Sequence, residues 1–208
     1  TRRSSDLMKH EWKKQEKDLY GVKANPVMVD VPLQKFIMIS GKGNPNDTDF
    51  SDKVGALYSL AYAIKMGYKS APTSNEITDF TVYPLEGIWK QIEDSELVKD
   101  NLEYTIMIRQ PDFINREMVD NALEKVRVKK PNPLYEEISF DTMNDGKSVQ
   151  ILHIGAFDDE PVSFDKMDEF LKTNQLERIE SYHREIYLNN ANRTEKSKLK
   201  TILRYKIK

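Results

Sequence analysis

Cysteine is absent from the 208-residue sequence, and histidine is rare. The lack of cysteine excludes a disulfide framework, thiolate metal sites and cysteine nucleophiles. The three histidines, His10, His153 and His183, stand too far apart in the chain to suggest a zinc cluster. We therefore expect no metal site and no cofactor.

The sequence also lacks a large net charge and has no long apolar run. The sequence has 32 Lys and Arg against 34 Asp and Glu, a formal net charge of -2 at pH 7, which disfavours a protein that binds nucleic acid by neutralising phosphates. No stretch approaches the roughly 18 apolar residues of a membrane span, and the N-terminal residues lack the apolar segment of a signal peptide. We expect a cytoplasmic monomer or homodimer whose partner is a small molecule, with no nucleic acid or membrane as partner.

The order of the expected secondary structure repeats once along the chain. Apolar residues alternate, or recur at helical spacing, between clusters of Gly, Pro, Asn and Asp. The first half is predicted to contain a strand at 31–39, a helix from an Asp49 N-cap to Gly67, and strands at 80–89 and 102–109. The second half is predicted to contain a strand at 148–155, a helix at 162–173, and strands at 182–188 and 199–205. Each half therefore has the order strand, helix, strand, strand.

These halves predict one α+β domain built as a tandem pseudo-two-fold repeat. One helix over a small sheet buries little apolar surface, so two modules that share a core form the most economical fold. We expect residues 1–28 to form a solvated arm or a short charged helix, and residues 29–208 to form the domain, with repeats at about 29–130 and 131–208. A ligand cleft should lie along the junction of the repeats.

The strand at 182–188 contains the strongest candidate for chemistry. Alternation places His183, Glu185 and Tyr187 on one face. If Ile186 and Leu188 face the helices, Glu185 projects into solvent or into the cleft between the repeats. An exposed charge is the ordinary explanation for a strand glutamate. A carboxylate among titratable and aromatic neighbours is also typical of a cation site, or of a general base whose pKa is raised by partial burial.

The corresponding strand of the first repeat adds a second group of candidates. Tyr83, Glu86 and Trp89 surround Gly87, a glycine that keeps the backbone open. A pocket lined with rings and a few polar groups suits a flat organic ligand, although a tryptophan is as often part of the core. Met107, on the alternate face of its own strand, would supply soft packing for such a ligand.

The second repeat also offers candidates near the start of its helix. His153 ends a strand, and it is either a ligand-binding residue or a hydrogen-bonded structural one. Asp159 and Glu160 are expected to cap the helix that follows, rather than to bind a metal.

Six short segments carry a resemblance to a known family. They are GKGNP (41–45), PLEGIW (84–89), MIRQP (107–111), QILHIG (150–155), HREIYL (183–188) and KLKTILR (198–204). In this order, over residues 31–204, they resemble the GyrI-like small-molecule-binding family. That family's GyrI-like or SOUL-like fold is a tandem pair of strand-helix-strand-strand modules, with the ligand in the groove between them. Arg184 departs from the commoner family pattern, in which a second histidine is usual.

The resemblance implies two functions. Some stand-alone members hydrolyse cyclopropanoid cyclohexadienone genotoxins, which implies that Glu185 is a general base and that Tyr187, Tyr83 or Tyr104 donates to the developing oxyanion. Trp89 would stack on the ligand. In relatives fused to transcription regulators, the carboxylate that matches Glu185 binds lipophilic cations. The alternative is therefore a non-catalytic module that binds drugs or sequesters toxins.

Overall fold

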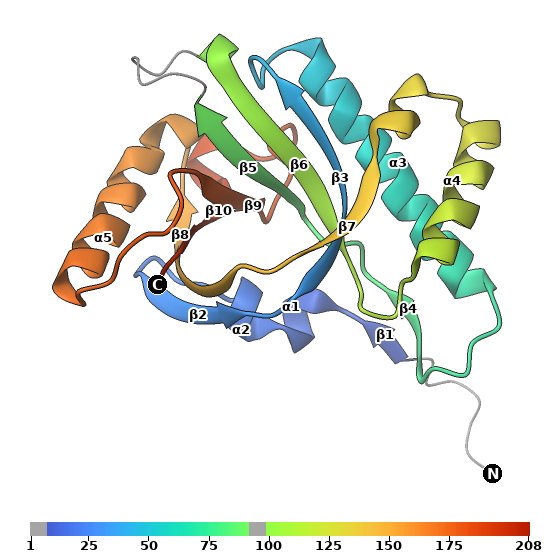
Figure 1. The fold of residues 1–208 in the computed structure, drawn as a ribbon, viewed down its shortest axis with the longest axis horizontal. Coiled ribbons are helices and arrows are strands. Elements are labelled where there is room, and N and C mark those ends of the chain that lie inside the picture. Colours follow the sequence, from blue (N-terminus) through green and yellow to red (C-terminus); the bar gives the residue numbers. More distant parts are fainter. Residues whose placement is uncertain (1–7, 92–98) are drawn as a thin grey trace.

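An eight-stranded antiparallel sheet organises the chain. The computed structural model describes residues 8–91 and 99–208. Its strands lie side by side in the order β2 (Val27–Val31), β8 (Gly146–Ile154), β10 (Lys200–Lys206), β9 (His183–Tyr187), β5 (Leu85–Gln91), β6 (Leu102–Gln110), β3 (Gln34–Lys42) and β7 (Ser139–Met143). A separate parallel pair joins β1 (Met8–His10) to β4 (Ile77–Phe80). Figure 1 shows helix α5 (Glu160–Thr173) at one end of the curled sheet and helices α3 (Thr48–Ser70) and α4 (Arg116–Lys129) at the other.

Two copies of one module make up most of this sheet. The first consists of β3, α3 (Thr48–Ser70), β5 and β6, and the second of β8, α5 (Glu160–Thr173), β9 and β10. The predicted order of strand, helix, strand and strand is confirmed in both halves, and so is the tandem α+β fold. Because β5 pairs with β9, the two modules share one continuous sheet.

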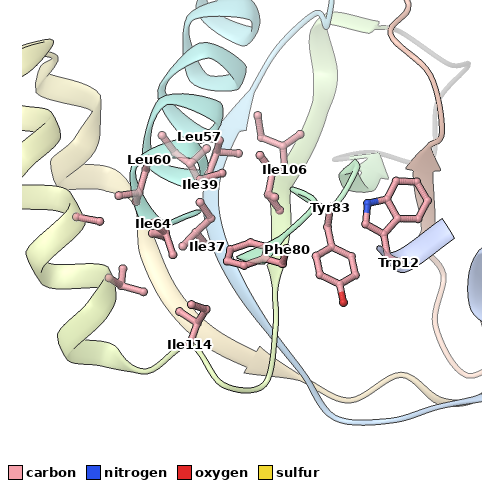
Figure 2. Close-up of a cluster of buried hydrophobic side chains, with 14 of the residues drawn as sticks. Trp12, Ile37, Ile39, Leu57, Leu60, Ile64, Phe80, Tyr83, Ile106 and Ile114 are labelled. Atoms are coloured by element: carbon pink, nitrogen blue, oxygen red, sulfur yellow. The ribbon is translucent and has the colours of Figure 1, made fainter. Parts of the chain in front are cut away.

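Helix α3 supplies much of the core of the first module. Its Leu57, Leu60 and Ile64 recur at three- and four-residue spacing, and each is at most 2% exposed. In Figure 2 these side chains lie against Ile37 of β3 and Ile106 of β6. Helical spacing on α3 and strand alternation on β3 and β6 therefore build one shared apolar layer.

The remaining helices are shorter. Helix α4 (Arg116–Lys129) packs against α3 and begins after Asn115, whose side chain accepts a hydrogen bond from the Met118 N–H at 2.9 Å. The predicted N-cap of α3, Asp49, lies in the first turn instead, because the helix begins at Thr48. The short elements are α1 (Trp12–Gln15), α2 (Lys17–Tyr20) and the 3-10 helices Lys99–Asn101, Pro133–Glu137, Phe157–Asp159 and Lys196–Lys198. No helix within residues 8–91 and 99–208 is both long and apolar enough to cross a membrane.

The N-terminal segment is packed onto the domain. Trp12 is only 5% exposed, and its indole N–H donates to the Val82 carbonyl oxygen at 3.0 Å. Glu16 accepts hydrogen bonds from Arg109 at 2.7 Å and from the Tyr83 hydroxyl at 2.5 Å. The expectation of a solvated arm is therefore wrong for this segment, and the short charged helix that was its alternative occurs as α1 and α2. The part of the expected arm before Met8 lies outside the described residues.

Candidate functional site

The two modules meet at a seam between β5 and β9. Gly87 lies opposite Glu185, and Trp89 lies opposite His183. Because side chains alternate across a strand, these side chains and that of Tyr187 project from the same face. The predicted shared face of the three β9 residues is confirmed. Helices α3 and α5 lie over this face, so they cover the glutamate rather than the apolar side of β9.

Glu185 is the acceptor at the centre of a hydrogen-bonded chain. Its Oε1 lies 2.7 Å from His183 Nε2, and its Oε2 accepts a 2.6 Å hydrogen bond from the Tyr187 hydroxyl. The Tyr187 oxygen accepts in turn from the Trp89 indole N–H at 2.8 Å. Burial, and then the Glu185 charge, raise the pKa of Tyr187 well above its ordinary value, so the phenol keeps its proton. Both carboxyl oxygens of Glu185 are therefore held in place, one by the Tyr187 hydroxyl and the other beside the His183 ring.

Glycine at position 87 makes room for this chain. A Cβ there would lie 2.7 Å from Trp89 Nε1 and 3.1 Å from the Tyr187 oxygen. The first distance is shorter than van der Waals contact allows, so a larger residue would displace the indole. With glycine present, Trp89 folds back over β5 and reaches across the seam to β9. The open backbone predicted from the sequence is therefore filled by the tryptophan ring.

A second carboxyl group faces Glu185 from the start of α5. One oxygen of Glu160, one oxygen of Glu185 and a ring nitrogen of His183 all lie within 4.8 Å of one another. Glu160 is 7% exposed, and burial followed by repulsion from Glu185 raises its pKa to about 9. Two buried carboxyls this close do not both ionise, so Glu160 carries a proton at neutral pH. Among the residues that the structure describes, these three also have the spacing to hold a metal ion, which the sequence analysis did not anticipate.

Sequence reasoning missed Glu160 as a site residue. It assigned this acid to helix capping, and Glu160 is indeed the first residue of α5. Acids are common in the first turn of a helix because they favour its positive end, so the residue type alone does not reveal a buried side chain. The distinguishing feature is tertiary: the start of α5 lies over the seam.

Aromatic rings from both modules border the acid pair. Four ring pairs have centroid separations between 4.7 and 5.8 Å: Phe164 with His183, Phe157 with Tyr187, Phe50 with Trp89, and Trp89 with Tyr104. Rings on both sides of a carboxylate suit a flat, largely apolar ligand with one polar centre. The candidates Trp89 and Tyr104 both lie in this border.

Comparison with known proteins agrees with this architecture. The family model for the GyrI-like small molecule binding domain matches residues 24–206. The chain belongs to the GyrI-like family. No protein with a curated description matches it.

Solved structures similar to this chain cover most of its length. A hydrolase encoded by lin2189 from Listeria innocua is 33% identical, with a TM-score of 0.89, over 97% of this chain and 100% of that one. An uncharacterized conserved protein from Listeria innocua is also 33% identical, with a TM-score of 0.88, over 96% of this chain and 100% of that one. The EcmrR C-terminal domain, 11% identical over 88% of this chain and 97% of that one, has a TM-score of 0.54 and shares the fold alone.

Three predicted ligand-binding residues lie away from the residues around Glu185. Glu86 of β5 and Met107, its partner on β6, project from the reverse face of the sheet and are at most 1% exposed. Tyr83 precedes β5 and lies under the N-terminal segment, where it bonds to Glu16. The prediction that these three join Glu185 in one site is wrong: strand alternation turns Glu86 and Met107 to the other face, and Tyr83 packs against the N-terminal segment.

His153 lies on the same face of the sheet as Glu185, but its ring is held by structural partners. Its Nδ1 is 2.8 Å from Ser163 Oγ, and its Nε2 is 2.9 Å from the Ala156 carbonyl oxygen. One nitrogen therefore joins β8 to α5, and the other joins β8 to the connection that precedes α5. This geometry favours the hydrogen-bonded structural role over direct ligand contact.

Replacing Glu160 should change how stability depends on pH. The folded-state pKa is raised from 4.5 to about 9, so the folded state keeps a proton that the unfolded state releases. The resulting stabilisation is complete below pH 4.5 and is lost as the pH rises to about 9. Glu160→Gln removes this titration. We expect the free energy of unfolding of the variant to rise relative to the wild type by more than about 1 kcal/mol between about pH 5 and pH 9.

Urea unfolding at both pH values measures this difference. Glu195→Gln is the matched control, because that side chain is 65% exposed. Parallel pH profiles for wild type and Glu160→Gln would show that Glu160 is not the buried acid described here.

Proposed function

We propose that this site binds a planar, largely apolar molecule and adds water to a strained ring in it, as a cytoplasmic hydrolase that protects the cell from cyclopropanoid genotoxins. The observation that carries the proposal is the close pairing of Glu185 with Glu160, whose pKa is raised to about 9, among aromatic rings. General acid–base catalysis needs a base and an acid within reach of one substrate. The 33% identical Listeria innocua protein that is named a hydrolase supports the same reaction class.

Each part of this reaction has a candidate group. Glu185 accepts a proton from water while the water oxygen forms a bond to a cyclopropane carbon. The ring C–C bond breaks, and its electron pair moves through the conjugated system to the carbonyl oxygen, which takes a proton from Glu160. The product is a phenol that carries a new hydroxyl group. Because the two carboxyls face each other, the proton gained by Glu185 can pass to Glu160 and restore the starting state.

In this proposal Glu160 takes the role of proton donor that the sequence analysis gave to a tyrosine. The hydroxyl of Tyr187 already donates to Glu185, and the hydroxyl of Tyr104 lies 3.4 Å from an Asp49 oxygen. Tyr187 is therefore a positioning residue. Its hydroxyl holds the Glu185 carboxyl group, and its oxygen holds the Trp89 ring by accepting the indole N–H.

Non-catalytic binding of a lipophilic cation is the second candidate function. The observation that favours it is the same carboxylate among rings, since carboxylates and aromatic faces both attract cations. Repeated release of hydrated product from a cyclopropanoid cyclohexadienone distinguishes the two, because a binding protein does not turn over.

Glu185→Gln keeps the shape of the side chain but removes the base. Turnover of a cyclopropanoid cyclohexadienone should fall by roughly two to four orders of magnitude, while affinity for neutral ligands persists. Steady-state kinetics with Glu195→Gln as control measures this effect. If Glu185→Gln turns over substrate as fast as the wild type, Glu185 is not part of the mechanism. If the wild-type protein shows no turnover and Glu185→Gln loses affinity only for cationic ligands, the non-catalytic binding module is favoured.

Trp89 should report ligand binding directly. Its ring lies beside the acid pair, so a stacked ligand should quench its fluorescence, whereas Trp12, buried where the N-terminal segment packs on the domain, should not respond. Trp12→Phe removes the background. Trp89→Ala should weaken binding by about 1 to 3 kcal/mol, the range for losing one aromatic partner. A loss of about 3 to 5 kcal/mol in folding stability, with no ligand-dependent fluorescence in the wild type, would instead assign Trp89 to the core.

A further inference from the structure

The reverse face of the seam contains a polar pocket. A cavity of about 170 Å³ lies against β9 and β10, with the β7–β8 connection at its side. Its charged lining residues are Arg184, Arg204, Lys206 and Asp145. Arg184 precedes Glu185 in β9 and projects to the opposite face. The thickness of the sheet therefore separates this cavity from the acid pair.

Two buried arginines lie directly opposite each other in this lining. Arg184 pairs with Arg204 across β9 and β10, and the two residues are 5% and 3% exposed. Like charges opposite each other in a sheet repel, and burial strengthens the repulsion because the local dielectric constant is low. Asp145 accepts from Arg184 Nε and Nη2 at 2.8 and 2.9 Å and from Arg204 Nη1 at 3.2 Å. One carboxylate therefore serves two guanidinium groups.

The other acceptors around Arg184 compensate its charge poorly. Nη1 contacts the sulfur of Met107 at 3.0 Å, and Nη2 contacts that of Met143 at 3.7 Å; thioether sulfur is a weak acceptor. The Glu86 carboxyl lies 3.5 Å from Nη1, but burial raises the pKa of Glu86, which favours its neutral form. Arg204 also donates through Nε and Nη2 to Gln150 Oε1, at 3.2 Å each, but this amide oxygen carries no charge. The arginine pair is therefore hydrogen-bonded, yet its positive charge is only partly balanced, and an anionic ligand would offset it.

Lys206 adds a third positive charge to the lining. Its Nζ lies 3.8 Å from a Glu180 oxygen, and both side chains are partly exposed, at 27% and 34%, so water screens this ion pair. The positive charge of the lining is therefore concentrated at the two arginines and extends along β10 to Lys206.

We propose that this pocket binds a small oxyanion of the phosphate or carboxylate type between Arg184, Arg204 and Lys206. Guanidinium groups bind the paired oxygens of both anions, and the cavity has room for inorganic phosphate or a small organic acid. A bound negative charge offsets the repulsion between the arginines. The acids at the front of the seam repel the same ligand, so this site is independent of the proposed substrate pocket.

Titration with inorganic phosphate tests the proposal. At constant ionic strength, maintained with potassium chloride, phosphate should raise the Tm of the wild type saturably, and isothermal titration calorimetry should show one site. Lys206→Met should weaken binding by about tenfold, the cost of losing one charge-assisted contact. Lys208→Met is the control, because it removes the same charge from an exposed residue nearby. Malonate in place of phosphate shows which oxyanion fits better.

Two results would overturn the proposal. Equal, non-saturable stabilisation of the wild type and both lysine variants would identify a general salt effect. Phosphate binding that is unchanged in Lys206→Met but becomes tighter in Glu185→Gln, where one repelling acid is removed, would place the anion at the front of the seam. Phosphate binding that is unchanged in Glu185→Gln supports the rear site. This result does not depend on whether Glu185→Gln still turns over substrate, so the anion site and the proposed hydrolase are tested separately.

Discussion

The register between β5 and β9 places Gly87 opposite Glu185, and the rest of the site depends on that pairing. With glycine there, the Trp89 indole crosses the seam and bonds to Tyr187, which holds the glutamate. A slip of one residue would turn Glu185 to the reverse face. The interaction that joins the two modules into one sheet is therefore also the one that assembles the candidate site.

Two consecutive residues of β9, Arg184 and Glu185, project from opposite faces of the sheet and have side chains of opposite charge type. On the front, two acids at close range are relieved by a proton on Glu160. On the rear, Arg184 and Arg204 are relieved by the single carboxylate of Asp145. Each face therefore holds like charges that local packing forces together, a costly arrangement that is common where proteins bind or react with ligands. Alternation keeps the two groups apart while one strand positions both.

Local patterns were enough to predict part of this arrangement. The two-module order follows from the spacing of apolar runs, and the shared face of His183, Glu185 and Tyr187 follows from the strand period. Which face of β9 the helices cover was not predictable, because each face carries a buried charged residue, Arg184 on one and Glu185 on the other. Glu86 was grouped with Trp89 even though strand alternation places these two side chains on opposite faces of β5. Burial of Trp12 within a charged segment likewise depends on tertiary contacts that no short period shows.

In the proposed reaction, a proton held by Glu160 beside Glu185 lets the two carboxyls act as acid and base. The ¹³C chemical shift of the Glu160 carboxyl carbon, assigned by comparison with Glu160→Gln, measures its protonation directly. We expect the shift of a protonated acid to persist through neutral pH and to change near pH 9. A transition near pH 4.5, the ordinary value for glutamate, would contradict the account.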